Sequence, residues 1–169
     1  MVAELRIETE GTRAIEQRMA QLIVRFEDLT PLTEAMGVYL ESATIDRFDT
    51  ETAPDGNRWE QSIRAREEGG KTLTDSAQLR SSITSEADAS STAVGTNKIY
   101  AGVHQDGATI TAKSSPRLTF QLPGGLGFRS VESVEVPARP FLGLSRDDEI
   151  ELHALAEDFA RDAGGDGFQ

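Results

Sequence analysis

Apolar side chains recur at helical spacing in two consecutive segments near the beginning of the chain. A short alternating stretch over 5–9 precedes them and predicts a β-strand. Helices are predicted over about 12–30 and 31–50, because apolar residues return every three or four positions in both segments. Between them, Thr30 is predicted to cap the second helix and Pro31 to occupy its first helical position.

The middle of the chain alternates between turns and short elements. A loop is predicted over 53–59, since Pro54-Asp55-Gly56 combines residues that favour tight turns. A short helical piece is predicted over 60–68, ended by Gly69-Gly70. A further short helix is predicted to begin at Asp75, which has Gln78 at capping-box spacing.

Alternating patterns then predict short strands. Two of them cover 83–88 and 92–96 and form a hairpin. One or two helical turns are expected over 98–106, followed by Gly107 at the position where glycine commonly ends a helix.

The last third of the chain predicts a second hairpin and a final helix. Polar and apolar residues alternate on both sides of a glycine-rich tip, which indicates a β-hairpin over 117–129, and alternation resumes over 131–136. Ser145 is predicted to cap a helix whose apolar stripe ends at Ala163.

These elements predict an α+β fold. We expect a small antiparallel β-sheet with a projecting β-hairpin, packed against N-terminal helices and a C-terminal helix. The length of 169 residues is typical of one domain, which we place at 1–163, with a flexible tail at 164–169.

The charge balance is strongly acidic. Asp and Glu number 29 against 17 Lys and Arg, which gives a formal net charge of −12. Binding to a phosphate backbone requires Lys and Arg to neutralise it, so this chain is not predicted to hold nucleic acid tightly. High acidity with only three lysines is also typical of halophilic proteins, whose net charge maintains solubility.

The chain contains no cysteine and no apolar run near the roughly 20 residues that span a bilayer. Its first residues do not resemble a signal peptide. We therefore expect no disulfide and no membrane partner, and assembly in the host cytoplasm.

Catalytic and cofactor signatures are weak. His104 and His153 are the only imidazoles, and neither lies in a recognisable set of metal ligands. The glycines of 124–127 lack the features of a phosphate loop or a dinucleotide site. We predict no cofactor, no metal and no catalytic residue, and interpret His104 as a structural residue hydrogen-bonded near a helix end.

Several residues have two plausible roles. Trp59 is either a core residue beside the 54–56 turn or an anchor at a subunit contact. Arg139 is held extended by Pro140, so its guanidinium suits a bidentate carboxylate. That carboxylate either lies within the subunit and fixes the last helix, or lies across an interface. Phe141 is an apolar anchor beside it.

The 117–129 hairpin places Arg117, Phe120 and Arg129 in an acidic chain. It either projects toward a neighbouring subunit or the lumen of a ring, or is a surface excursion without a role.

Four short blocks follow one another in a defined order. They are Pro54-Asp55-Gly56-Asn57-Arg58-Trp59, Leu73-Thr74-Asp75-Ser76-Ala77-Gln78-Leu79-Arg80, Tyr100-Ala101-Gly102-Val103-His104-Gln105-Asp106-Gly107 and Val136-Pro137-Ala138-Arg139-Pro140-Phe141-Leu142-Gly143-Leu144-Ser145. In this order they resemble the virion-morphogenesis, or tail-completion, family of Mu-like tailed phages. The resemblance covers about 45–150, and it departs from the family pattern at Ser76-Ala77 and at Asp106.

The resemblance implies a structural virion protein with no chemistry of its own. It implies a tail-completion or neck ring at the head–tail junction. Tails and necks are built on sixfold or twelvefold axes, so the ring is expected to be a hexamer, with a dodecamer as the alternative. The expected partners are further copies of the chain, the adjoining head–tail connector and tail tube proteins, and genomic DNA that passes through the lumen without sequence-specific binding. A haloarchaeal tailed virus is one source compatible with the acidity.

Other functions remain open at this point. A tail terminator or a head-side stopper ring shares the same expectations. A metal-dependent nuclease or hydrolase using His104, and an assembly chaperone absent from the virion, are the alternatives from other classes. If the ring interpretation is right, Arg139→Ala and Phe141→Ala should block assembly more than folding.

Overall fold

The computed structural model describes residues 17, 19–20, 23–24, 26–113 and 116–164. The strand predicted over 5–9 lies outside the described residues, as does much of the helix predicted over 12–30. The described residues between 17 and 27 are helical, in agreement with that prediction.

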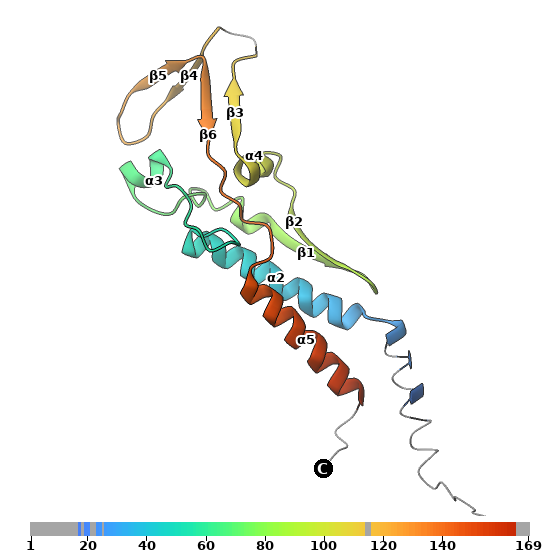
Figure 1. The fold of residues 1–169 in the computed structure, drawn as a ribbon. Coiled ribbons are helices and arrows are strands. Elements are labelled where there is room, and N and C mark those ends of the chain that lie inside the picture. The colour runs from blue at the N-terminus through green and yellow to red at the C-terminus, as the bar shows by residue number, and fades with distance from the viewer. Residues whose placement is uncertain (1–16, 18, 21–22, 25, 114–115, 165–169) are drawn as a thin grey trace, which may run out of the picture.

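Two long helices, α2 (Thr30–Thr50) and α5 (Arg146–Gly164), lie side by side and form one end of the molecule (Figure 1). The start of α2 differs from the prediction. Thr30 is already helical, and the carboxylate of Asp28 accepts a hydrogen bond from its backbone N–H at 2.9 Å. The N-cap residue is Leu29, without a side-chain cap, so the cap predicted at Thr30 is wrong, and Asp28 instead satisfies one of the free backbone N–H groups of the first turn.

The hairpin formed by β1 (Ile83–Ala87) and β2 (Thr92–Thr96) packs along α2. Gly37 allows this close approach, since a Cβ atom there would lie 2.6 Å from the hydroxyl oxygen of Thr92. The hairpin and its two strands are confirmed as predicted.

Two short helices were predicted between α2 and β1, and only the first of them is present. Helix α3 (Ile63–Glu68) is confirmed: Ser62 caps it, and Gly69 ends it with φ 81°. The helix predicted from Asp75 is wrong, because 75–79 form turns and only a 3₁₀ turn, η1 (Arg80–Ser82), follows. Ala77 has φ 58°, a left-handed conformation that interrupts a right-handed helix.

The opposite end of the molecule is a projecting arm, defined here as residues 107–137 (Figure 1). It follows α4 (Ala101–Asp106), which is confirmed as predicted. In the arm, β3 (Ala108–Thr111) pairs with β6 (Ser133–Val136), and β4 (Leu118–Gln121) pairs with β5 (Phe128–Val131).

The α+β class is confirmed, but the strands do not form the single small sheet that was predicted. They form three separate two-stranded antiparallel sheets in the described part of the chain. The 117–129 hairpin is present, whereas β3 was not predicted. Its four residues, Ala-Thr-Ile-Thr, are too short and too exposed to give a clear pattern, and they become a strand by pairing with β6.

Candidate functional site

The core brings together the four sequence blocks, although they are far apart in the chain. The buried side chains that form it are Phe48, Ala53, Trp59, Leu79, Ile83, Ala101 and Phe141. Phe48 is at the centre, with its ring centroid 5.5 Å from that of Trp59 and 5.3 Å from that of Phe141. Each block thus contributes to one hydrophobic cluster, whose burial is the main favourable term in folding.

Trp59 lies in this core and not at the surface of the subunit. Its indole N–H donates to the backbone carbonyl of Pro140 at 2.9 Å, which satisfies its only polar atom. Of its two predicted roles, the core role is the one that the structure confirms. The same hydrogen bond joins the first block to the last.

Gln105 links α4 to the last block through its side-chain amide. Its Nε2 donates to the carbonyl of Leu142 at 2.9 Å, and its Oε1 accepts from the backbone N–H groups of Phe141 and Leu142, both at 3.1 Å. The amide therefore replaces a neighbouring strand for this extended segment. Backbone groups that would otherwise be unpaired are satisfied in this way.

Gly107 permits the close contact at the end of α4. It has φ 73°, and a Cβ atom there would lie 2.9 Å from the backbone nitrogen of Ala138. The backbone N–H of Arg139 also donates to the carbonyl of His104 at 2.6 Å. The close approach of the 136–138 backbone requires a residue without a side chain at position 107.

A buried ion pair between Arg47 and Asp148 joins α2 to α5, and sequence reasoning missed it. Arg47 Nη2 donates to the Asp148 carboxylate, while Nη1 donates to the carbonyls of Phe141 and Gly143 at 2.8 and 2.9 Å. The sequence did contain a sign of this pair: Arg47 lies four residues after Ala43, which places a charged residue on the apolar stripe of α2.

Asp148 also completes the start of α5. It accepts from the backbone N–H of Ser145 at 2.6 Å, and Ser145 Oγ accepts from the backbone N–H of Asp148 at 3.1 Å. This reciprocal pair is a capping box with aspartate in the place of glutamate. The predicted cap at Ser145 is confirmed.

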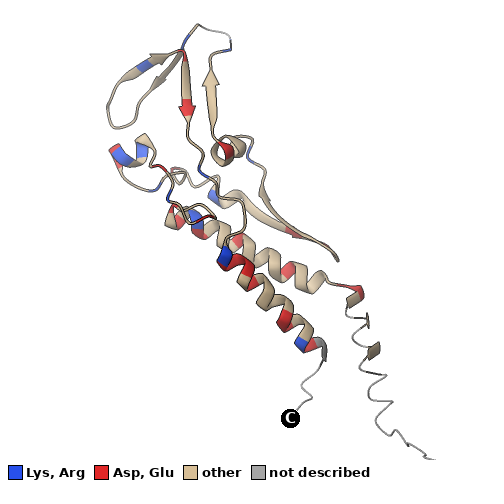
Figure 2. Cartoon of the chain, viewed as in Figure 1, with Lys and Arg blue, Asp and Glu red and all other residues tan. Residues whose placement is uncertain are grey.

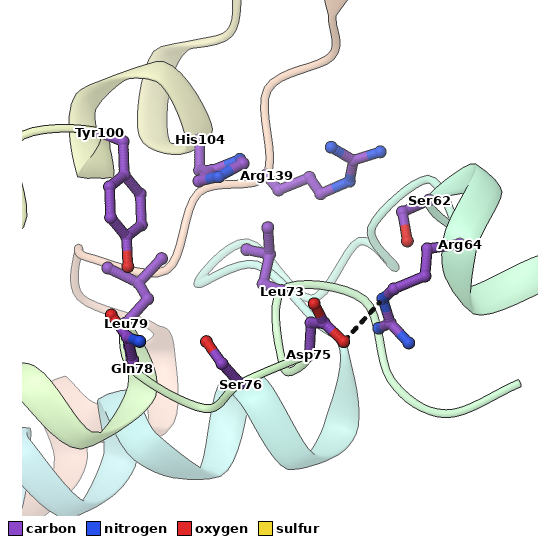
Figure 3. Close-up of a pocket in the computed structure, with 10 residues that line it drawn as sticks. All are labelled: Ser62, Arg64, Leu73, Asp75, Ser76, Gln78, Leu79, Tyr100, His104 and Arg139. Atoms are coloured by element: carbon purple, nitrogen blue, oxygen red, sulfur yellow. Dashed lines mark ion pairs between the residues drawn. The ribbon is translucent and has the colours of Figure 1, made fainter. Parts of the chain in front are cut away.

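A cleft of about 300 Å³ lies where the second, third and fourth blocks meet (Figure 3). Its lining residues are Ser62, Arg64, Leu73, Asp75, Ser76, Gln78, Leu79, Tyr100, His104 and Arg139. Arg64 and Asp75 form an ion pair at 3.6 Å, and the Asp75 side chain is largely exposed. The cleft therefore combines two arginines and three hydroxyl groups with the apolar side chains of Leu73 and Leu79.

Arg139 is 6% exposed, and its Nε donates to the carbonyl of Glu60 at 2.7 Å. No carboxylate among the described residues forms an ion pair with it. The predicted internal pair that fixes the last helix is therefore wrong for Arg139, because Arg47 fixes that helix. Burial lowers the pKa of the Arg139 guanidinium, and the charge of Glu60 partly opposes this shift.

His104 is in α4, beside Arg139 and Tyr100, with the His104 and Tyr100 rings in an edge-on contact at 6.1 Å. Its backbone carbonyl is hydrogen-bonded, but its ring Nδ1 is buried without a hydrogen-bond partner, contrary to the prediction. Burial, and then the charge of Arg139, lower the pKa of His104 below its ordinary value. The described residues include no group of three His, Cys, Asp or Glu that could hold a metal.

Three further candidates, Arg117, Phe120 and Arg129, lie in the arm, away from the cleft. Arg117 donates to the carbonyl of Ser130 at 2.7 Å across the β4–β5 pair. Phe120 and Arg129 are opposite one another in the same pair. Pro140 and Phe141, by contrast, belong to the core segment, and Phe141 is completely buried. The candidates thus divide between the arm and the core motif, which is the set of four sequence blocks that meet around Phe48.

The burial of Arg139 and Phe141 changes the effect expected from their substitution. Phe141→Ala would leave a cavity at the centre of the subunit, so its first effect should be on folding. The earlier expectation that it blocks assembly more than folding is therefore wrong for Phe141.

Within the described ranges, no helix combines the length and apolar character needed to cross a membrane.

Comparisons with known proteins agree with the pattern of the four blocks. A sequence model of the phage virion morphogenesis family matches residues 11–159. The chain is also similar to the Mu-like prophage FluMu G protein 2 of Haemophilus influenzae, with 28% identity over 155 residues, covering 92% of this chain and 95% of that protein. No solved structure gives a significant match. With almost its whole length covered by the family match, this chain belongs to the phage virion morphogenesis family.

Proposed function

We propose that this chain is a structural subunit of the head–tail junction, a tail-completion or neck protein that assembles into a ring. Family membership assigns it to phage morphogenesis. The ring, its place in the virion and its partners are the proposal.

The arm is the observation that carries the proposal. It consists of two separate two-stranded sheets with exposed apolar side chains, including Phe128, which is 75% exposed. An isolated two-stranded sheet is marginally stable in water, and its open edges invite pairing with another chain. Such an arm supports a subunit that completes itself by contact with its neighbours.

The distribution of charge supports the same conclusion. The arm contains Lys113, Arg117 and Arg129 against Glu132 and Glu135, a net charge of +1, so the remainder of the chain carries −13. Figure 2 shows the arm largely without charge, while Asp and Glu recur along α2 and α5. A nearly neutral arm avoids the like-charge repulsion that would oppose its contact with the acidic remainder of the next copy in a ring.

The proposed mechanism is binding without chemistry. The core motif makes the body rigid, and the arm joins neighbouring copies through a head-to-tail interface that closes into a ring. An acidic lumen would repel the phosphate backbone and let packaged DNA slide through. Adjoining connector and tail tube proteins would contact the two faces of the ring.

Electron microscopy of particles made without this chain tests the proposal. In a lysate of the phage with the gene disrupted, we expect DNA-filled heads and tails of normal length that remain unjoined. Supplying the wild-type chain should restore joined particles. Tails of excessive length would indicate a terminator, and empty heads would indicate a stopper on the head side.

A second measurement asks whether the chain is part of the finished particle. We expect it in purified virions by mass spectrometry, in several copies per particle. Its absence from infectious virions would contradict the structural role and favour a chaperone.

A further inference from the structure

Arg139 is a buried cation without a buried anion. Its side chain is enclosed by the subunit and makes one hydrogen bond, to the carbonyl of Glu60, and no described carboxylate pairs with it. Buried charges in proteins are generally paired, because taking an ion out of water is costly. The two terminal nitrogens of Arg139 have no hydrogen-bond acceptor among the described residues, and they are not among the fully buried unsatisfied atoms, so a ligand in the cleft can reach them.

The surroundings of Arg139 are suited to receive that partner. Pro140 restrains the backbone of Arg139, so the guanidinium is held on a stiff segment. Figure 3 shows its side chain extending across the cleft toward the side formed by Ser62 and Arg64, in line with the hydrogen bond to Glu60. Arg139 is the principal donor at this place, because the neighbouring Arg64 already donates to the carbonyls of Gly69 and Lys71.

His104 contributes a buried unsatisfied polar atom to the same cleft. Its ring is directed toward Arg139, and its Nδ1 is buried without a hydrogen-bond partner (Figure 3). Unsatisfied buried polar atoms are uncommon in folded proteins. An unsatisfied buried ring nitrogen beside an arginine without an ion-pair partner indicates a missing ligand more strongly than either observation alone.

We propose that this cleft binds a carboxylate of a neighbouring copy of the chain, with Arg139 as its principal donor. The inference rests on the proposed function, since it requires that copies assemble. The planar fork of arginine matches a carboxylate through two parallel hydrogen bonds. It gives the ring a defined register at each interface.

A carboxylate fits the cleft better than a phosphate. Asp75 lies in the lining and would repel a group with a higher negative charge. The chain as a whole carries −12, which also opposes binding to a nucleic acid backbone. The same acidity means that every copy has many exposed carboxylates, such as Glu149 and Glu157 of α5, that could reach the cleft of the next.

The first test compares assembly and stability in full-length proteins. Arg139→Met should raise the concentration at which half of the protein is assembled by at least about tenfold in light scattering. Its urea midpoint, measured below the assembly concentration, should stay close to the wild-type value, because the change removes an unpaired buried charge. Arg58→Met is the matched control, since Arg58 is exposed and carries the same charge outside the cleft.

The outcomes separate this inference from the ring itself. Equal assembly of Arg139→Met and wild type would overturn the cleft inference and leave the ring in place. A large loss of subunit stability in Arg139→Met would also overturn it, by showing that the guanidinium is needed within the subunit. A wild-type chain that is monomeric in solution and absent from virions would overturn both proposals.

A second test identifies the carboxylate. Arg139→Lys keeps the charge but provides an amine, which a carbodiimide couples to a carboxylate in contact with it. In assemblies mixed from ¹⁵N-labelled and unlabelled copies, we expect crosslinks between position 139 of one copy and an Asp or Glu of another. Arg58→Lys gives the background from an exposed site. Crosslinks only within one copy, or none above that background, would refute the inference.

Discussion

Removing the Asp148 carboxylate should destabilise the subunit more than removing any exposed acidic group of α5. Asp148→Ala deletes the partner of Arg47 and two further contacts, with the Ser145 backbone N–H and the Tyr39 hydroxyl. Arg47 would remain buried, because the carbonyls of Phe141 and Gly143 still hold its other nitrogen. The substitution therefore leaves a buried cation without its anion.

The magnitude follows from the burial of both partners, whose side chains are 8% and 5% exposed. Breaking a buried pair on one side typically costs about 3–5 kcal/mol. For a chain of this size each kcal/mol lowers the melting temperature by roughly 2–4 °C. We therefore expect a fall of roughly 6–20 °C, larger than the effect of losing the helix cap alone, which is about 1 kcal/mol.

Thermal and urea unfolding of the purified subunit measure this effect. Asp147→Ala is the control, since Asp147 is the preceding residue, carries the same charge and is exposed. Its effect should stay within roughly 0.5 kcal/mol, as is usual at the surface. The double substitution Arg47→Met with Asp148→Leu should recover much of the loss, because it removes both buried charges.

A loss below about 1 kcal/mol for Asp148→Ala would refute this reasoning. It would mean that Arg47 reaches water in the variant, and that the pair does not fix α5 to α2. A double variant as unstable as the single one would show that packing at these positions, and not the unpaired charge, sets the cost.

Three further outcomes test the core motif. Phe141→Ala should cost about 3–5 kcal/mol in urea unfolding, whereas Phe128→Ala in the exposed arm should change the subunit little, and equal effects would contradict the assigned core. Gly107→Ala and Gly125→Ala both place alanine at positive φ, but only position 107 adds a clash with the 136–138 backbone, so thermal melting should rank Gly107→Ala as clearly the more damaging. Because burial lowers the pKa of His104, the stability that its neutral form provides is present above pH 6.5 and declines as pH falls toward the folded pKa, since the unfolded chain takes up the proton first. His104→Gln should flatten that part of the stability profile, and an unchanged slope would count against this account.

Local pattern was enough to predict most of the elements. Helix α2, the β1–β2 hairpin, α4, the β4–β5 hairpin and the Ser145 cap follow from periodicity and from capping and turn residues close to one another in sequence. The two local failures have local causes. The helix begins one residue earlier than predicted, with Leu29 and not Thr30 at the N-cap, and Ala77 adopts a conformation that its side chain does not favour.

The grouping of the functional residues needed the tertiary structure. The amide of Gln105 pairs with Phe141 and Leu142, more than 30 positions away, and no spacing rule predicts such a contact. Arg47 and Arg139 look equally able to bind a carboxylate when only the sequence is considered. The fold gives Arg47 its partner in Asp148 and leaves Arg139 without one.

The sequence by itself determined the α+β class, the acidic character and the resemblance to virion morphogenesis proteins, because these depend on composition and on short, ordered blocks. Only the tertiary structure decided that those blocks form one core, that the described strands remain three separate pairs, and that Arg139 lines a cleft without an ion-pair partner among the described residues. The reason is physical: periodicity reports which face of an element is apolar, whereas the partner of a buried polar group depends on which distant segments the packing brings within hydrogen-bonding distance.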